Sequence, residues 1–169
     1  MSQNVYSPKD VDISFGAGGL NVDGWDSITI SRNSENTSKN IAADGRLGLT
    51  YSADVTGSFD IEVQQQNSAV NAFCAELQRQ QDIARKPYFF NLTVSDKSGG
   101  VLCDLKGAFL DMPANQDLAA EAGSRTWMFY VENIQYKPNP SGFEGATEAI
   151  TNAQALVANV IGNSTNRLS

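Results

Sequence analysis

The feature that most constrains the fold of this chain is a strict alternation of apolar and polar residues from Val55 to Val63. Successive side chains of a β-strand point to opposite faces, so this segment predicts a strand with one buried and one solvated face. The apolar row is Val55, Gly57, Phe59, Ile61 and Val63. The opposite row is acidic and hydroxyl-rich: Thr56, Ser58, Asp60 and Glu62.

Comparable patterns elsewhere predict a mainly β, antiparallel architecture. Further strands are expected at 11–15, 25–30, 47–51, 87–95, 101–111 and 125–136. The glycine-rich segment 16–19 is predicted to connect the first two strands, and Asp96 to Gly100 has the turn chemistry of a hairpin. Leu47, Leu49 and Tyr51 share one face, and the bend at 52–54 suggests that their strand forms a hairpin with 55–63.

Two segments have helical periodicity. Asn67 or Ser68 can cap a helix over about 68–84, which must end before the helix breaker Pro87. A small-residue amphipathic helix is expected after the proline-rich segment 138–140, with apolar positions from Ala146 to Ile161. We therefore expect a β domain over 1–140 and a C-terminal helical extension over 141–169.

The segment Ser31 to Asp44 is polar, has neither helical nor strand periodicity and contains three asparagines. It predicts a long exposed loop between strands. A loop of this length in a compact domain is usually functional.

The composition excludes much catalytic chemistry. Histidine is absent, which removes the usual general base and the commonest zinc ligand. Cys74 and Cys103 lie among apolar neighbours without a metal-binding spacing, and both are expected to be buried free thiols. The glycines of 16–19 lack the Lys-Ser/Thr that a phosphate-binding loop requires. No cofactor is expected.

Carboxylates offer the remaining route to catalysis or cation binding. The candidates are Asp54, Asp60, Glu62, Asp104, Asp111 and Glu132. None forms a calcium-loop pattern, and solvated sheet faces explain them better. The net charge of -7 also disfavours stable DNA binding, because its field repels phosphates. No secretion signal or membrane span is expected, since no basic segment precedes an apolar run and no apolar stretch is long enough.

Four segments, in this order and spacing, resemble the tail tube proteins of contractile-tailed phages. They are Pro8-Lys-Asp-Val, Ala43-Asp-Gly-Arg, the stretch from Gly57 to Asn71, and Gly123-Ser-Arg-Thr-Trp. The resemblance spans about residues 6–136 and rests on structural signatures, not catalytic ones. The C-terminal helix appears as an extension beyond the family pattern.

The resemblance implies an antiparallel β-sandwich or split barrel with a flanking helix. Subunits of this family assemble as stacked hexameric rings whose sheets join into a continuous β-barrel tube, the conduit for genome ejection inside a contractile sheath. The implied partners are further copies of the chain, the sheath, a baseplate initiator, a tape-measure protein and a tail terminator. The implied location is the virion tail, assembled in the host cytoplasm, with DNA passing without stable binding and no membrane contact.

An acidic lumen repels phosphates within a Debye length of about 8 Å at physiological salt. Thr56, Ser58, Asp60 and Glu62 are therefore predicted to line the lumen. The alternative for this face is plain outer surface. Glu132 is a weaker lumen candidate, since it lies on the opposite side of its strand from Trp127, Phe129 and Val131.

The polar segment 32–44 is predicted to reach a neighbouring subunit through intersubunit hydrogen bonds and ion pairs. The candidate residues are Arg32, Asn33, Glu35, Lys39, Asn40, Asp44 and Arg46. The alternative is a mobile surface loop.

Three other functions remain open from the sequence. A capsid decoration or baseplate interaction domain also fits an acidic, mostly β chain. The tube of a phage-derived bacteriocin or injection system shares the pattern. A carboxylate-based or metal-assisted enzyme needs several carboxylates converging in a pocket.

Overall fold

The computed structural model describes residues 8, 11–16, 20–21, 24–139 and 146–166. The chain divides into two compact units. The larger contains Ile13–Val94 and Cys103–Gln135, and the smaller contains Met1–Asp12, Ser95–Leu102 and Tyr136–Ser169.

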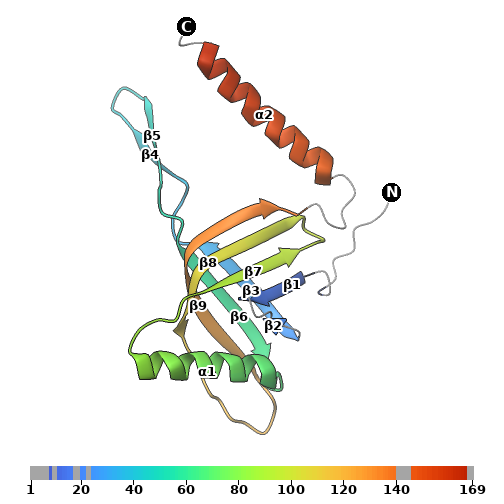
Figure 1. The fold of residues 1–169 in the computed structure, drawn as a ribbon. Coiled ribbons are helices and arrows are strands. Elements are labelled where there is room, and N and C mark those ends of the chain that lie inside the picture. The colour runs from blue at the N-terminus through green and yellow to red at the C-terminus, as the bar shows by residue number, and fades with distance from the viewer. Residues whose placement is uncertain (1–7, 9–10, 17–19, 22–23, 140–145, 167–169) are drawn as a thin grey trace. The chain divides into compact units, whose positions relative to one another are not determined.

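Most of the described strands belong to one curved sheet (Figure 1). They are β1 (Val11–Phe15), β2 (Leu20–Asn21), β3 (Trp25–Arg32), β6 (Gly57–Gln64), β7 (Phe90–Asp96), β8 (Val101–Met112) and β9 (Ser124–Pro138). Their order is β2-β1-β7-β8-β9-β6-β3, which leaves β2 and β3 at the edges. The expectation of a mainly β, antiparallel fold is confirmed.

The predicted strands at 11–15 and 25–30 both exist, yet they are not sheet neighbours. Strand β1 pairs with β2 through Ser14 and Phe15. Strand β3 instead pairs with β6, from Trp25 opposite Val63 to Arg32 opposite Gly57. Most of the predicted glycine turn, residues 17–19, lies outside the described residues.

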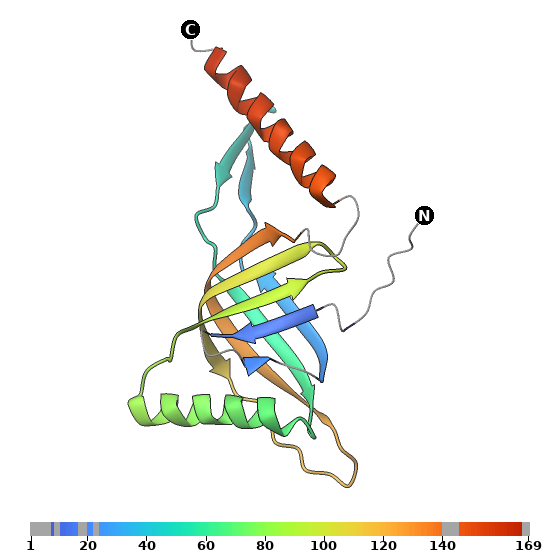
Figure 2. The same cartoon turned by 45° about the vertical axis from the view of Figure 1, so that its right-hand side comes forward.

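Two expectations about the segment after β3 were wrong. Residues 31–44 are not one long loop, because β4 (Thr37–Ile41) forms within them. Strand β5 (Leu47–Tyr51) pairs with β4 and not with β6. The two strands form a separate antiparallel hairpin, visible in two views (Figures 1 and 2).

Strand β6 lies inside the sheet and pairs with both β3 and β9. Its burial alternates as the sequence predicted, with Phe59, Ile61 and Val63 fully buried. Gly57 is needed where β6 begins, because a Cβ there would lie 2.3 Å from the Ser31 carbonyl oxygen and 2.2 Å from Cδ1 of Ile134.

Aromatic side chains form the centre of the core. Phe15 packs against Phe73 from the helix at a ring distance of 5.3 Å and against Phe90 at 5.8 Å. Phe129 lies 5.8 Å from both Phe59 and Phe90. These contacts join four strands that are distant in the sequence, so these aromatic side chains serve the packing of the core.

Helix α1 (Ser68–Ala84) has the bounds that the sequence predicted. The Asn67 side chain accepts a hydrogen bond from the Val70 amide at 3.4 Å, and Arg85 ends the helix in the left-handed region with φ 54°. The buried Asn71 side chain accepts a 2.9 Å hydrogen bond from Nε1 of Trp127. This bond ties the helix to β9.

Cys74 and Cys103 are buried and free, as expected. Burial raises the pKa of the Cys74 thiol to about 12.

In the smaller unit the turn between β7 and β8 is joined to the end of β9. The Asn139 amide donates to the Gly100 carbonyl at 2.8 Å, and its side chain donates to Oγ of Ser95 at 2.7 Å. Lys97 pairs with Asp12 at 3.3 Å. Helix α2 (Ala146–Asn166) confirms the expected C-terminal helix, whereas Pro140 lies outside the described residues. No helix in the described part of the chain is long and apolar enough to cross a membrane.

Candidate assembly surfaces

The predicted lumen row lies on the polar face of the sheet. Ser58, Asp60 and Glu62 alternate with the buried residues of β6, and Thr56 precedes the strand. The same face continues onto both neighbouring strands. The residues opposite Ser58, Asp60 and Glu62 are Ser31, Thr29 and Ser27 on β3, and Tyr130, Met128 and Thr126 on β9.

The two carboxylates of this row have different environments. Glu62 accepts hydrogen bonds from Oγ of Ser124 at 2.6 Å and of Ser27 at 3.0 Å, and these bonds lower its pKa. Partial burial raises the pKa of Asp60. Glu62 is therefore the firmer fixed negative charge on this face.

Glu132 also belongs to the polar face. On β9 it points away from the core side of its neighbour Val131 and shares the face of Tyr130, whose strand partner is Ser58. A Cβ at Gly107 would lie 2.6 Å from its carboxylate oxygen, so the Glu132 side chain extends over β8. Its side of the strand is thus the side of Asp60, and its place in the lumen stays a prediction.

A hydrogen-bonded cluster holds the base of the β4–β5 hairpin. Asp54 accepts from Oγ of Ser34 at 2.5 Å and from Oγ1 of Thr56 at 2.6 Å, which lowers its pKa to about 2. The Asn33 side chain donates to Thr56 at 3.1 Å and to the Tyr130 hydroxyl at 3.2 Å. The segments before and after the hairpin are therefore tied to each other.

Arg32 is engaged within its own subunit. Its guanidinium donates to the Ile134 carbonyl at 2.7 Å and to Oδ1 of Asn36 at 3.3 Å. Arg32 and Asn33 thus secure the base from which the hairpin extends. Their predicted role in contacting a neighbour stays a prediction.

The remaining candidates of this segment are exposed along the hairpin. Glu35 precedes β4, and Lys39 and Asn40 lie on it. At the tip Arg46 pairs with Asp44 at 3.3 Å. The structure brings these side chains onto one projecting element, where they are accessible to another molecule.

The sequence reasoning missed an exposed apolar surface on this hairpin. The strand register places Thr37, Lys39 and Ile41 on one face with Tyr51, Leu49 and Leu47. We call this the hairpin apolar face. Its large side chains are strongly exposed: Ile41 72%, Leu47 60%, Leu49 61% and Tyr51 74%. The Asp44-Gly45 dipeptide, which is typical of hairpin turns, is the sequence signal from which this hairpin could have been predicted.

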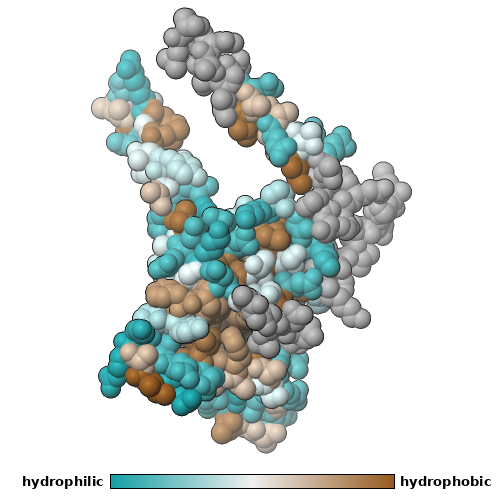
Figure 3. Space-filling view, viewed as in Figure 1, coloured by the Kyte–Doolittle hydropathy of each residue, from teal (hydrophilic) through white to brown (hydrophobic). Residues whose placement is uncertain are grey.

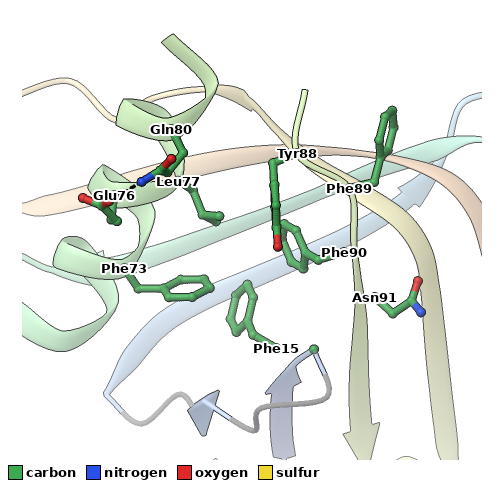
Figure 4. A pocket seen from close by; sticks show the side chains of 10 residues that line it. Phe15, Phe73, Glu76, Leu77, Gln80, Tyr88, Phe89, Phe90 and Asn91 are labelled. Carbon is green, nitrogen blue, oxygen red and sulfur yellow. Dashed lines mark hydrogen bonds between the residues drawn. The ribbon is translucent and has the colours of Figure 1, made fainter. Parts of the chain in front are cut away.

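A second apolar surface lies beside α1 (Figure 3). It is a cavity of about 750 Å³, which we call the α1 groove (Figure 4). Its lining consists of Phe15, Gly16, Phe73, Glu76, Leu77, Gln80, Tyr88, Phe89, Phe90 and Asn91. Tyr88 and Phe89 are 58% and 51% exposed, so apolar surface at the groove faces solvent.

The walls of the α1 groove are held in place by hydrogen bonds. The Gln81 side chain donates to the Leu110 carbonyl at 3.0 Å and accepts from the Tyr88 amide at 3.2 Å. The Gly16 amide donates to the Asn91 carbonyl at 2.7 Å. The helix, the segment that follows it and the end of β1 thus form a preorganised surface.

Among the described residues, no group of three or more histidine, cysteine, aspartate or glutamate side chains is placed to hold a metal ion.

The sequence model of the bacteriophage PhiTE tail tube protein matches residues 8–138. The chain belongs to this tail tube family. The match covers nearly the same residues as the resemblance noted above, and it includes β6, the hairpin and the α1 groove. Helix α2 lies beyond it. The protein is thus a structural component of a phage tail.

Solved structures share the tail tube fold at low sequence identity. A chain of the sheath and tube terminator of the extracellular contractile injection system PVC has a TM-score of 0.57 at 8% identity, covering 81% of this chain and 99% of its own. A chain of the anti-feeding prophage tube-terminating cap has a TM-score of 0.56 at 11% sequence identity, and the match covers 82% of this chain and 94% of that one. A chain of the native gene transfer agent virion has a TM-score of 0.53 at 14% sequence identity, and the match covers 79% of this chain and 99% of that one. No curated protein sequence matches the chain significantly.

Proposed function

We propose that this tail tube protein assembles into rings of six that stack into a hollow conduit for genome ejection within a contractile sheath. The observation that carries the proposal is the hairpin apolar face, which is unsuited to an isolated subunit. Two-stranded hairpins are marginal in water without packing, and Leu49 and Tyr51 are 61% and 74% exposed. Burial against another copy supplies the missing packing.

The edges of the sheet support ring formation. Strand β3 is an eight-residue edge strand, and an unprotected edge of this length tends to pair with another chain. Joining such edges between subunits closes a barrel and removes them. The symmetry is supported by a structurally similar gene transfer agent tail, which was described with C6 symmetry.

We assign the polar face of Ser58, Asp60, Glu62 and Glu132 to the lumen. Hydroxyls and carboxylates interact well with water, and fixed negative charge repels the phosphates of passing DNA. The low pKa of Glu62 keeps that carboxylate charged at neutral pH. The same face has no role in the core, because the opposite face holds the packed aromatic cluster.

The function is structural and non-enzymatic, and the partners follow from it. Chains of similar fold come from a sheath–tube complex, a tube terminator and a baseplate. We assign this chain equivalent contacts with a sheath, a terminator and a baseplate initiator, and passing contacts with a tape-measure protein and DNA. Assembly takes place in the host cytoplasm, and the product is part of the virion.

Residues 1–140 are proposed to be the tube-forming domain and 141–169 a helical extension of separate function. The family match ends at residue 138, which supports a boundary near this position. The exposed Leu156 and Val157 of α2 give the extension its own apolar surface.

Two alternatives are distinguished by what the protein assembles into. A tube of a bacteriocin or injection system has the same subunit contacts but no genome to pass. A capsid decoration or baseplate domain forms monomers or closed oligomers, not open stacks.

Negative-stain electron microscopy of the purified protein at high concentration tests the proposal. High concentration overcomes the need for an initiator, because nucleation of a polymer depends steeply on subunit concentration. We expect hollow tubes with a regular axial repeat. Monomers or single closed rings at every concentration would contradict the proposal.

A further inference from the structure

Within the described part of the chain, the hairpin apolar face and the α1 groove both face solvent. We propose that the β4–β5 hairpin of one copy docks, apolar face first, into the α1 groove of a copy in the adjacent ring. The inference rests on the proposed stacking of rings and names the two surfaces that join them.

The two surfaces match in their apolar character. The hairpin contributes Ile41, Leu47, Leu49 and Tyr51, each at least 60% exposed. The groove offers a cavity of about 750 Å³ with aromatic walls. Apolar surfaces of this kind resemble an interface core, where aromatic and aliphatic anchors fill preformed pockets.

The charges of the two surfaces are also complementary. Among the six residues of the hairpin apolar face, Lys39 alone is charged. Among the described residues that line the groove, Glu76 alone is charged. Hydrogen bonds from Arg79 and Gln80 lower the pKa of Glu76 to about 2, so its carboxylate is ionised under all physiological conditions. Glu76 already forms an ion pair with Arg79 of its own helix at 2.9 Å. Lys39 of the docked hairpin joins this pair as a second cation and fixes the orientation of the hairpin.

The position of the two surfaces makes the contact repeat along an axis. The hairpin extends from the Arg32 and Gly57 end of the β3–β6 pair, whereas α1 follows the other end of β6 after Gln64. Eight residues of strand, about 26 Å, separate these ends. Figures 1 and 2 show the hairpin and α1 at opposite ends of the larger unit. A head-to-tail contact between different patches builds open stacks.

Disulfide trapping tests the geometry. A variant with Leu49→Cys and Phe89→Cys is assembled, mildly oxidised and analysed on denaturing gels. We expect a ladder that continues past six copies, because the contact links successive rings. The matched control is Thr50→Cys with Phe89→Cys, since Thr50 lies on the opposite face of the hairpin, and it should give no ladder.

The outcomes separate this inference from the proposed function. Tubes that form without cross-links would overturn the docking contact while leaving the tube intact. A ladder that stops at six copies would overturn it too, since the hairpin would then join neighbours within one ring. A protein that never forms tubes would overturn both.

Charge exchange provides a second test that does not depend on cysteine chemistry. Lys39→Glu and Glu76→Lys should each raise the critical concentration for assembly about tenfold, because each creates a like-charge contact. The double variant should return to within about threefold of the wild type. Circular dichroism checks that each variant keeps its fold. Additive effects in the double variant would overturn the pairing.

Discussion

Two leucines on the hairpin allow the contribution of this element to assembly to be measured. Leu47 and Leu49 are 60% and 61% exposed in the subunit. Complete burial of a leucine side chain is worth about 1.5–3 kcal/mol. If assembly buries the exposed part of each leucine side chain, that part contributes about 1–2 kcal/mol of contact free energy. An alanine at the same position keeps a fraction of this contribution. We expect the double Leu→Ala variant to lose about 2 kcal/mol of contact energy per added subunit.

A loss of this size raises the critical concentration about 30-fold, since each 1.4 kcal/mol is a factor of ten. The assay pellets tubes by ultracentrifugation over a range of total concentrations and measures the protein that stays in solution. The free energy of unfolding of the subunit should change by less than about 0.5 kcal/mol in urea, because the side chains are already exposed.

The matched control substitutes alanine for Ser38 and Thr50, which form a register pair on the other face of the hairpin. Its critical concentration should stay within about twofold of the wild type. The reasoning is refuted if the leucine variant assembles as readily as this control. A large fall in the stability of the subunit would refute it as well, by showing that the hairpin packs within its own chain.

Three further predictions concern the core, the lumen and the hairpin base. Asn71→Ala should lower the free energy of unfolding, measured in urea, by about 1–3 kcal/mol, because it leaves the buried Trp127 indole N–H without its acceptor. A change below about 0.5 kcal/mol would contradict this. Reversal of Asp60 and Glu62 to lysine should leave tubes intact but slow DNA delivery, and short DNA should then be retained with pelleted tubes. The control reverses acidic residues in the 113–123 segment and should retain no DNA. Unchanged retention by the Asp60 and Glu62 variant would refute the lumen assignment. The Asp54 carboxylate has its pKa depressed from 3.8 to about 2, so its contribution to stability is present above about pH 4 and is lost as the pH falls toward 2. The urea midpoint of the wild type should therefore fall more steeply over this range than that of Asp54→Asn, and parallel curves would exclude the effect.

Local signals made much of the fold predictable. Helix α1 was placed correctly because Asn67 provides a cap and Pro87 a stop close by in the sequence. The two faces of β6 followed from its alternation, which reports burial directly. Such features depend on neighbours within a few residues.

Strand pairing was less predictable, because periodicity does not say which strand lies beside which. Leu47, Leu49 and Tyr51 were placed on one face correctly, but the bend at 52–54 favoured pairing with β6. Strand β4 was missed because Thr37, Ser38, Lys39 and Asn40 lack the apolar residues of a core strand. A strand that packs against another copy has no core face within its own chain. Its amphipathic character emerges only when β5 is placed opposite it.

The candidate site was predictable in the same uneven way. The lumen row could be proposed from four alternating positions, and the projecting segment from its polarity. The α1 groove could not be predicted, because it combines side chains from β1, α1, the segment before β7 and β7 itself. Only the tertiary fold brings these elements together.

A helical reconstruction of the assembled tube by cryo-electron microscopy tests the central claim most directly. The account predicts six subunits per ring, edge strands joined between neighbours into one barrel, and Asp60 and Glu62 facing the lumen. A closed oligomer without axial stacking, or a tube with the polar face of β6 on its outer surface, would contradict it.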